Sequence, residues 1–507
     1  MKHYIFYIPD YLDTFSLCES GKDIEYISDS VKDFDFQTGD KLVVCVGSDE
    51  AFYRYAFQVV SQKKETLRLK KIFETAPGYS KAEASSELSI VADNTLSLIS
   101  EEQFKILLQK MMISGLDEYK IQLPLNALDK TSNELTDLEN RIITAIRTKP
   151  FVLLAGISGT GKSRIVRQIA KACWPSGSEE NKAHKPSNFE MVQVKPNWHD
   201  SSELLGYVSR IGDKPEFIAG DFLKFIAKAW ENPGVPYFLC LDEMNLAPVE
   251  QYFAEYLSVV ESRKLQDDGK IIKTDPILRK EDEEWYFILT SKLTSKEDVR
   301  KDFNKNGIRI PQNLIVIGTV NMDETTYSFS RKVLDRAMTI EMNEVDLNGG
   351  LDKSKSHLPH IKPEQLLADA VEGYDVYQEE FKDDCDTVIK YLGAVNDVLA
   401  NTPFRVAYRT RNEFLIYVVN AIRMAGKDTD RNNVIAEALD EVTSMKILSR
   451  IEGDKRKVHF LDELRDRIKT GLDSIDNGDR SEEHSVSLAK IDTMSERLKS
   501  GYTSFWD

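Results

Sequence analysis

One segment limits the possible folds of this chain more than any other. Residues 151–163 read FVLLAGISGTGKS, in which an apolar run is followed by the complete pattern GxxxxGK[ST]. Apolar residues at helical spacing come next, so the segment predicts a buried strand, a glycine-rich turn and the start of a helix. Glycines let the backbone curl until several N–H groups point at phosphate oxygens, and a helix N-terminus adds positive charge. A glycine-rich turn that arose by chance would not explain the patterns on both sides, so we predict a phosphate-binding loop.

Each residue type in this loop, called the P-loop below, has an expected task. Lys162 should bridge the β- and γ-phosphates of a nucleoside triphosphate, and the Ser163 hydroxyl should hold Mg²⁺. The residues predicted to bind the nucleotide are Gly156, Ile157, Ser158, Gly159, Thr160, Gly161, Lys162 and Ser163. No residue of the sequence directly indicates which base is recognised, so the predicted cofactor is ATP or GTP with Mg²⁺.

A second apolar run ends in two carboxylates. Residues 237–243 read YFLCLDE, which predicts a buried strand that ends at Asp242 and Glu243. Asp242 is expected to hold Mg²⁺, directly or through water, and Glu243 to act as the base that polarises the attacking water. Two acids at a strand end often only face solvent, but the P-loop about 80 residues upstream favours the functional interpretation.

A third run, residues 313–320, ends at Asn321. A polar side chain at this point can hydrogen-bond the γ-phosphate or the water that attacks it. Taken alone, an asparagine after a strand would be an ordinary turn residue.

The chain has 507 residues, which is too long for a single compact core. Strand-like runs in the middle of the chain alternate with helical patterns, which is typical of a doubly wound α/β sheet. These runs lie at 151–155, 190–194, 236–241, 285–290 and 313–319. Earlier strands are predicted at 40–46, 53–60 and 66–73, and a break at 76–78. We therefore predict a β-rich domain at 1–95, a helical linker at 96–134, an α/β P-loop core at 135–345 with a first helix from 132 to 147, and a helical region at 346–507.

The overall composition restricts the cellular setting and the partners. The net charge of −17 should repel nucleic acid unless a local basic patch or a partner intervenes. No apolar run approaches the roughly 20 residues that span a bilayer, and acidic residues come too early for a signal peptide. We expect a cytoplasmic protein without membrane contact. Five widely spaced cysteines indicate buried thiols, not disulfides or a zinc site.

Several segments together resemble the McrB group, the AAA+ motor subunits of modified-cytosine restriction systems, within the dynein-related and MoxR-like subfamily. The segments that carry this resemblance are 192–200, 204–207, 241–247, 318–324, 329–337, 408–413 and 501–506. The resemblance covers roughly residues 135–507. It implies an AAA+ core with a helical lid, a homo-oligomer that forms a hexameric ring, and a separate McrC-like nuclease subunit. No nuclease motif is evident in the sequence itself.

The resemblance also implies roles for individual residues. Asn321 takes the sensor-1 position, Arg336 is the candidate arginine finger that reaches a neighbouring subunit's nucleotide, and Arg409 is the candidate sensor-2 residue of the lid, with Arg411 as a rival. The alternative for each arginine is a surface position beside an acidic residue. The sequence departs from the group at 321–326, where NMDETT replaces the consensus NTADRS, and the preference for GTP is therefore left open.

Residues 39–44, which read GDKLVV, and the strand at 53–60 give the N-terminal domain a resemblance to the EVE/PUA-like β-barrels found on some McrB relatives. Those barrels hold a flipped modified base in an aromatic pocket. The aromatic residues that qualify are Tyr4, Phe6, Tyr7, Tyr53, Tyr55 and Phe57. This resemblance implies binding of DNA, including modified DNA, through the domain. The alternative is that these rings fill a small core. For the whole chain, a MoxR-type chaperone that remodels protein complexes is the alternative function, whereas a pure nucleotide switch would need neither Glu243 nor Arg336.

Overall fold

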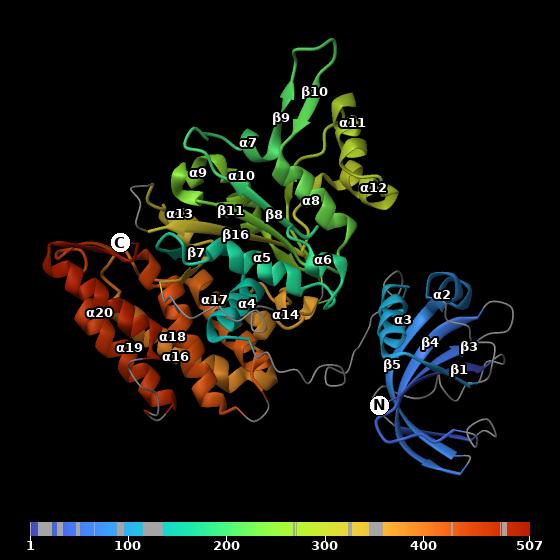
Figure 1. The fold of residues 1–507 in the computed structure, drawn as a ribbon. Helices are drawn as coiled ribbons and strands as arrows, with labels where there is room; N and C mark the ends of the chain where they lie inside the picture. Colours follow the sequence, from blue (N-terminus) through green and yellow to red (C-terminus); the bar gives the residue numbers. More distant parts are fainter. Residues whose placement is uncertain are drawn as a thin grey trace. The chain divides into compact units, whose positions relative to one another are not determined.

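The computed structural model describes the ranges 2–8, 23–27, 34–46, 51–64, 66–88, 96–114, 135–266, 269, 271–322, 327–343, 358–426, 429–476, 478 and 484–506. The chain divides into two compact units, Met1–Ser132 and Asn133–Asp507, which are described separately (Figure 1). Residues 323–326, which belong to the segment where the sequence departs from the McrB group, lie outside the described ranges.

The N-terminal unit is built on a six-stranded sheet in the order β2-β5-β4-β3-β1-β6. Its elements are β1 (His3–Ile8), β2 (Asp23–Ile27), β3 (Lys41–Val46), β4 (Phe52–Lys63), β5 (Thr66–Ser80), α2 (Lys81–Leu88), β6 (Leu96–Ile99) and α3 (Glu101–Ser114). Strands β1 and β3 run parallel, and the other pairs are antiparallel. The three strands predicted from the sequence are present. The predicted break at 76–78 falls inside β5, which continues to Ser80, but the pairing with β4 shifts register there, from Tyr55 opposite Glu74 to Tyr53 opposite Tyr79.

The predicted linker at 96–134 begins inside this unit. Strand β6 pairs with the edge of β1, so that Leu98 lies opposite Tyr4. Helix α3 covers one face of the sheet, where Phe104 and Leu107 are fully buried. The sequence pattern of α3 was interpreted correctly as helical, but a helix with a buried apolar face needs a sheet to pack on, and here it is the domain's own. The N-terminal domain therefore extends to at least Ser114.

The larger unit contains a five-stranded parallel sheet in the order β17-β7-β16-β11-β8. Its strands are β7 (Phe151–Gly156), β8 (Phe189–Gln193), β11 (Tyr237–Asp242), β16 (Leu314–Asn321) and β17 (Met338–Glu341). Alternation along β7 places Val152 and Leu154 in one core and Phe151 and Leu153 in the other. Both faces are thus covered by helices, as a parallel sheet requires. The doubly wound α/β fold is confirmed, and the sequence missed only the edge strand β17.

Helices α4 (Asp137–Thr148) and α5 (Lys162–Ala172) pack on one face, and α8 (Asp221–Glu231) on the other. Helix α4 starts later than the predicted residue 132, because Thr136 forms a capping box with Glu139. The shorter elements on the sheet are α6 (Glu179–Lys182), α7 (Ser202–Leu205), β9 (Gly206–Ser209), β10 (Glu216–Ala219), η3 (Met244–Leu246), α9 (Val249–Tyr252), α10 (Ala254–Val259), η4 (Val260–Ser262), β12 (Lys264–Leu265), β13 (Ile272–Lys273), β14 (Pro276–Leu278), β15 (Ile308–Arg309) and α13 (Arg331–Leu334).

The strand predicted at 285–290 is wrong, because these residues belong to helix α11 (Glu284–Leu293), which α12 (Glu297–Asn306) follows. The apolar run looked like a strand because it is short and uninterrupted. Its buried members are Trp285, Tyr286 and Leu289, at helical spacing, whereas Phe287 and Ile288 are exposed.

The described part of the C-terminal region is mainly helical, in line with the helical pattern predicted for 346–507. It contains α14 (Pro363–Leu366), α15 (Gly373–Val376), η6 (Glu379–Phe381), α16 (Lys382–Val398), α17 (Tyr408–Met424), α18 (Arg431–Lys446), η7 (Leu448–Arg450), β18 (Glu452–Asp454), α19 (Leu461–Asp476), α20 (Val486–Lys499) and β19 (Tyr502–Ser504). These helices share a hydrophobic core with α4 and α5 (Figure 1). The boundary between core and lid at 345/346 stays a prediction.

Candidate functional site

The P-loop lies where the sequence predicts it, between the end of β7 and the start of α5. Two of its residues, Gly159 (φ 86°) and Gly161 (φ 85°), have left-handed backbones that favour glycine. A third, Gly156, has no space for a side chain, since an added Cβ would lie 2.5 Å from the carbonyl oxygen of Met342. The loop's curl therefore depends on glycine at each of these positions for a specific reason.

Lys162 is buried although it carries a charge. Its Nζ donates hydrogen bonds to the carbonyl oxygens of Gly156 (2.9 Å) and Ile157 (2.7 Å), so the side chain folds back over the loop. A cation held at the first turn of a helix, above backbone N–H groups, suits a polyphosphate. The residues present thus fit a nucleoside triphosphate.

The Ser163 hydroxyl and the Asp242 carboxylate meet beside the P-loop. Ser163 Oγ donates to Asp242 Oδ1 at 2.6 Å, and Thr319 Oγ1 donates to the same oxygen at 2.8 Å. Hydroxyl and carboxylate oxygens are the ligands that Mg²⁺ prefers, so the pair fits the predicted metal. Thr319 was missed from the sequence. Side-chain alternation along β16 places it on the same face as Asn321, and this was the signal that could have identified it.

Glu243 and Asn321 are brought together at the same edge of the sheet. Asn321 Nδ2 donates to Glu243 Oε1 at 3.2 Å. The backbone of Glu243 is left-handed (φ 53°), and its N–H donates to Thr319 Oγ1 at 3.0 Å. A non-glycine residue held in this conformation is a frequent mark of a functional site.

One further contact to the P-loop comes from a residue that the sequence did not reveal. The side-chain oxygen of Asn343 accepts a hydrogen bond from the N–H of Ile157 at 3.1 Å. Asn343 follows β17, and β17 pairs with β7, so strand order alone brings it to the loop. Since β17 was not predicted, Asn343 could not be placed.

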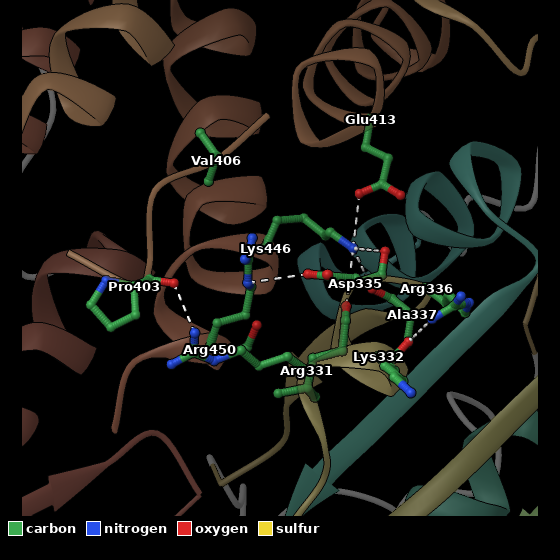
Figure 2. Close-up of polar contacts among 12 residues, drawn as sticks. Arg331, Lys332, Asp335, Arg336, Ala337, Pro403, Val406, Glu413, Lys446 and Arg450 are labelled. Atoms are coloured by element: carbon green, nitrogen blue, oxygen red, sulfur yellow. Dashed lines mark hydrogen bonds and ion pairs between the residues drawn. The ribbon is translucent and has the colours of Figure 1, made fainter. Parts of the chain in front are cut away.

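Arg336 and Arg409 form a second cluster around Glu261. Arg336 Nη2 lies 2.5 Å from Glu261 Oε2, and Arg409 forms an ion pair with the other carboxylate oxygen. Figure 2 shows Arg336 within the segment that follows α13, where its Nη1 donates to the Lys332 carbonyl. Among the contacts of described residues, none joins either arginine to the P-loop. Both assignments therefore stay predictions, while the rival Arg411 contacts Asn412 and Tyr408 instead.

In the N-terminal unit, five of the six candidate aromatic residues are buried in the core. Their exposed fractions are Tyr4 2%, Phe6 1%, Tyr53 0%, Tyr55 1% and Phe57 0%. They fill two cores, one on each face of the sheet, so they line no open pocket. Tyr7 is partly exposed, and Lys81 Nζ lies 3.7 Å from the centre of its ring. This outcome matches the alternative interpretation of these aromatic residues.

Four cysteines are described, and all are buried free thiols: Cys45, Cys173, Cys240 and Cys385. Burial raises the pKa of Cys45 to about 12 and that of Cys385 to about 11, so both are inert. Cys18 lies outside the described residues. No described helix is long and apolar enough to cross a membrane.

Residues 151–338 match the AAA domain of the dynein-related subfamily, and residues 366–502 match a domain of unknown function, DUF8727. A curated relative is the type IV methyl-directed restriction enzyme EcoKMcrB subunit of Escherichia coli (strain K12). It is 24% identical over 229 residues, which make up 44% of this chain and 42% of that protein. The matched region thus spans about two fifths of the relative's length.

A solved structure, the assembled ATPase EscN of the enteropathogenic E. coli type III secretion system, is 13% identical to this chain. The match covers 76% of this chain and 92% of that one, with a TM-score of 0.20. We therefore draw no conclusion about fold or function from this similarity.

Proposed function

We propose that this McrB-like chain, whose residues 151–338 are an AAA+ domain of the dynein-related subfamily, hydrolyses ATP or GTP to drive a DNA restriction system. The observation that carries the proposal is the meeting of Lys162, Ser163, Asp242, Glu243 and Asn321 at the ends of three neighbouring parallel strands. A protein that only bound nucleotide would need the first three of these groups but not the last two.

Each side chain has a defined task. Lys162 exchanges its bonds to two loop carbonyls for bonds to phosphate oxygens, and Ser163 and Asp242 hold Mg²⁺. When bound, Mg²⁺ neutralises negative charge on the β- and γ-phosphates. Glu243 accepts the proton of the attacking water at a carboxylate oxygen, and Asn321 orients that carboxylate through its amide.

The oligomeric part of the proposal is supported by the second cluster. Arg336 and Arg409 share Glu261 and contact no described residue of their own P-loop. Both guanidinium groups are paired with this carboxylate, and the Arg336 side chain is 16% exposed. In an oligomer, phosphate oxygens of a neighbouring copy's triphosphate would replace the carboxylate of Glu261 as the partner of Arg336. We propose a homo-oligomeric ring, hexameric as in the resemblance, with Arg336 as the finger in trans and Arg409 as the sensor-2 residue of the lid.

The partners follow from the similarity to the EcoKMcrB subunit, which belongs to a methyl-directed restriction enzyme. We propose that a separate McrC-like nuclease cuts DNA in the cytoplasm and that the N-terminal domain contacts that DNA. Since five of its aromatic side chains are buried, base recognition would need other residues than these.

The test is phosphate release by the purified chain with Mg²⁺ and either ATP or GTP. Lys162→Ala should abolish turnover of whichever nucleotide is used, because it removes the only P-loop cation. Lys171→Ala, at the other end of α5, is the matched control and should leave turnover unchanged. Turnover that survives Lys162→Ala would contradict the proposal. Cleavage of DNA by a co-expressed nuclease only when the chain is active would separate restriction from remodelling of protein complexes.

A further inference from the structure

Arg336 lies in a short segment that cannot fix its own orientation. Helix α13 has four residues, Arg331–Leu334, and Asp335, Arg336 and Ala337 follow before β17 begins. An isolated turn of helix is unstable, so outside contacts must hold these residues in place.

Three of those contacts come from one buried lysine of helix α18. Lys446 Nζ donates to the carbonyl oxygens of Leu334 (3.2 Å), Asp335 (3.2 Å) and Ala337 (2.7 Å). Figure 2 shows the ammonium group pointing into this segment from the helical region. The three carbonyls flank Arg336 on both sides, so the lysine fixes the backbone from which that side chain extends.

The charge of Lys446 is balanced at the same place. Its side chain is 1% exposed, and Nζ lies 2.8 Å from Glu413 Oε2 on helix α17. Glu413 also forms an ion pair with Lys149, whose Nζ donates to the Asp335 carbonyl at 3.3 Å. Burying a charge is costly unless it is paired and hydrogen-bonded, and this arrangement supplies both.

A further contact joins the segment to the same region. Arg450 Nε lies 3.2 Å from Asp335 Oδ1, just after helix α18. The segment around Arg336 thus contacts α18 and η7 directly, and α17 through the ion pair of Lys446 with Glu413.

We propose that Lys446 is the positioning residue of Arg336, and that it holds this arginine in the orientation in which a neighbouring copy's triphosphate receives it. The inference rests on the proposed function, namely that Arg336 acts in trans. A displacement of about 1 Å at a reacting centre can cost about 10²-fold in rate. Loss of Lys446 should therefore lower turnover on the neighbour's nucleotide without weakening nucleotide binding to the chain's own P-loop.

The experiment separates these two sides of a subunit by mixing variants. Lys162→Ala protein can donate a finger but not use nucleotide, whereas Arg336→Ala protein can use nucleotide but not donate. Mixing them should restore hydrolysis. We expect Lys446→Met to reduce the restored rate at least about tenfold when it is added to the donor, and to leave it within about twofold when it is added to the acceptor.

The matched control is Glu441→Gln on the same helix. Glu441 is buried and accepts from Arg141 Nε (2.8 Å) and Tyr417 Oη (2.7 Å), but it has no contact with residues 331–337. In the donor it should leave the restored rate unchanged. Arg450→Met removes a less buried contact to the same segment, and in the donor it should also lower the restored rate. It replaces Lys446→Met in the experiment if Lys446→Met does not fold.

The outcomes separate the two proposals. If the unmodified donor and acceptor do not restore hydrolysis, the trans role of Arg336 is wrong, and this inference falls with it. If they do, a Lys446→Met donor as good as its parent overturns the inference alone. Equal losses in donor and acceptor would assign Lys446 to general stability and overturn it too.

Discussion

Glu243 shows how a single residue combines strain and function. Its left-handed backbone, of a kind that costs on the order of 1 kcal/mol, is held by the hydrogen bond from its N–H to Thr319 Oγ1. That conformation turns the carboxylate towards Asn321 and away from Asp242. Two adjacent acids at one strand end thus receive different partners, one a serine and a threonine hydroxyl, the other an amide.

We predict that Glu243→Gln binds nucleotide normally but hydrolyses it about 10²–10⁴-fold more slowly. The amide keeps the size of the side chain but cannot take the proton of the attacking water. Nucleotide affinity and single-turnover rate should be measured together, with Glu250→Gln on the exposed face of α9 as the control. A fall of less than about tenfold would mean that Glu243 is not the base.

At the scale of residues, the sequence predicted the side chains that belong to a sequence motif or to a strand end. It missed the side chains that only the tertiary fold brings to the site. The strands and the P-loop that carry Lys162, Ser163, Asp242, Glu243 and Asn321 lie where the sequence predicts them, and the roles of these residues stay predictions. Glu261 was missed, since nothing in its local sequence indicates that two distant arginines converge on it.

At the scale of elements, strands with continuous apolar runs were predictable because a parallel sheet buries both faces. The strands β7, β11 and β16 have this pattern, with almost every residue buried. Strand β17 has only four residues, one of them a threonine, so its pattern is too short to recognise. Helix α11 was misread because a short apolar run does not distinguish helix from strand.

The packing of β7 against the residues after β17 gives a prediction for Gly156→Ala. The added Cβ would meet the Met342 carbonyl, which belongs to the backbone and cannot turn aside. We expect a loss of about 1–3 kcal/mol in unfolding free energy and weaker nucleotide binding, measured by denaturation and by titration.

Gly393→Ala is the matched comparison, because this residue lies within helix α16 and has open space around it. There the same substitution should stabilise by about 0.5–1 kcal/mol. Equal effects at both positions would contradict the packing argument.

At the scale of the whole molecule, the sequence predicted a β-rich N-terminal domain and an α/β core, but not where the N-terminal domain ends. The predicted boundary at 95 failed because α3 looks like any amphipathic helix until the sheet beneath it is known. Residue patterns do not predict how subunits assemble, because an interface is formed by residues that come together only in the folded structure.

Shared sites between copies make specific activity depend on concentration. We predict that turnover per chain falls as the protein is diluted below its assembly range, because Arg336 loses the neighbour it serves. Phosphate release should be measured over about a 100-fold dilution at saturating nucleotide, with sedimentation at the same concentrations. Constant activity per chain while the oligomer dissociates would show that each subunit works alone.

The order of strands in the parallel sheet has a consequence for coupling between the nucleotide sites of neighbouring subunits. Strand β17 begins two residues after Arg336 and is hydrogen-bonded to β7, whose last residue opens the P-loop. The far end of β17, where Glu341 lies opposite Ala155, is one strand spacing, about 4.8 Å, from β7 just before the P-loop. One strand therefore connects Arg336 to the loop that we predict binds the same subunit's own nucleotide. In a closed ring, this connection would couple each nucleotide site to the next one. Hydrolysis would then be cooperative, with a Hill coefficient above one, and not independent at each site.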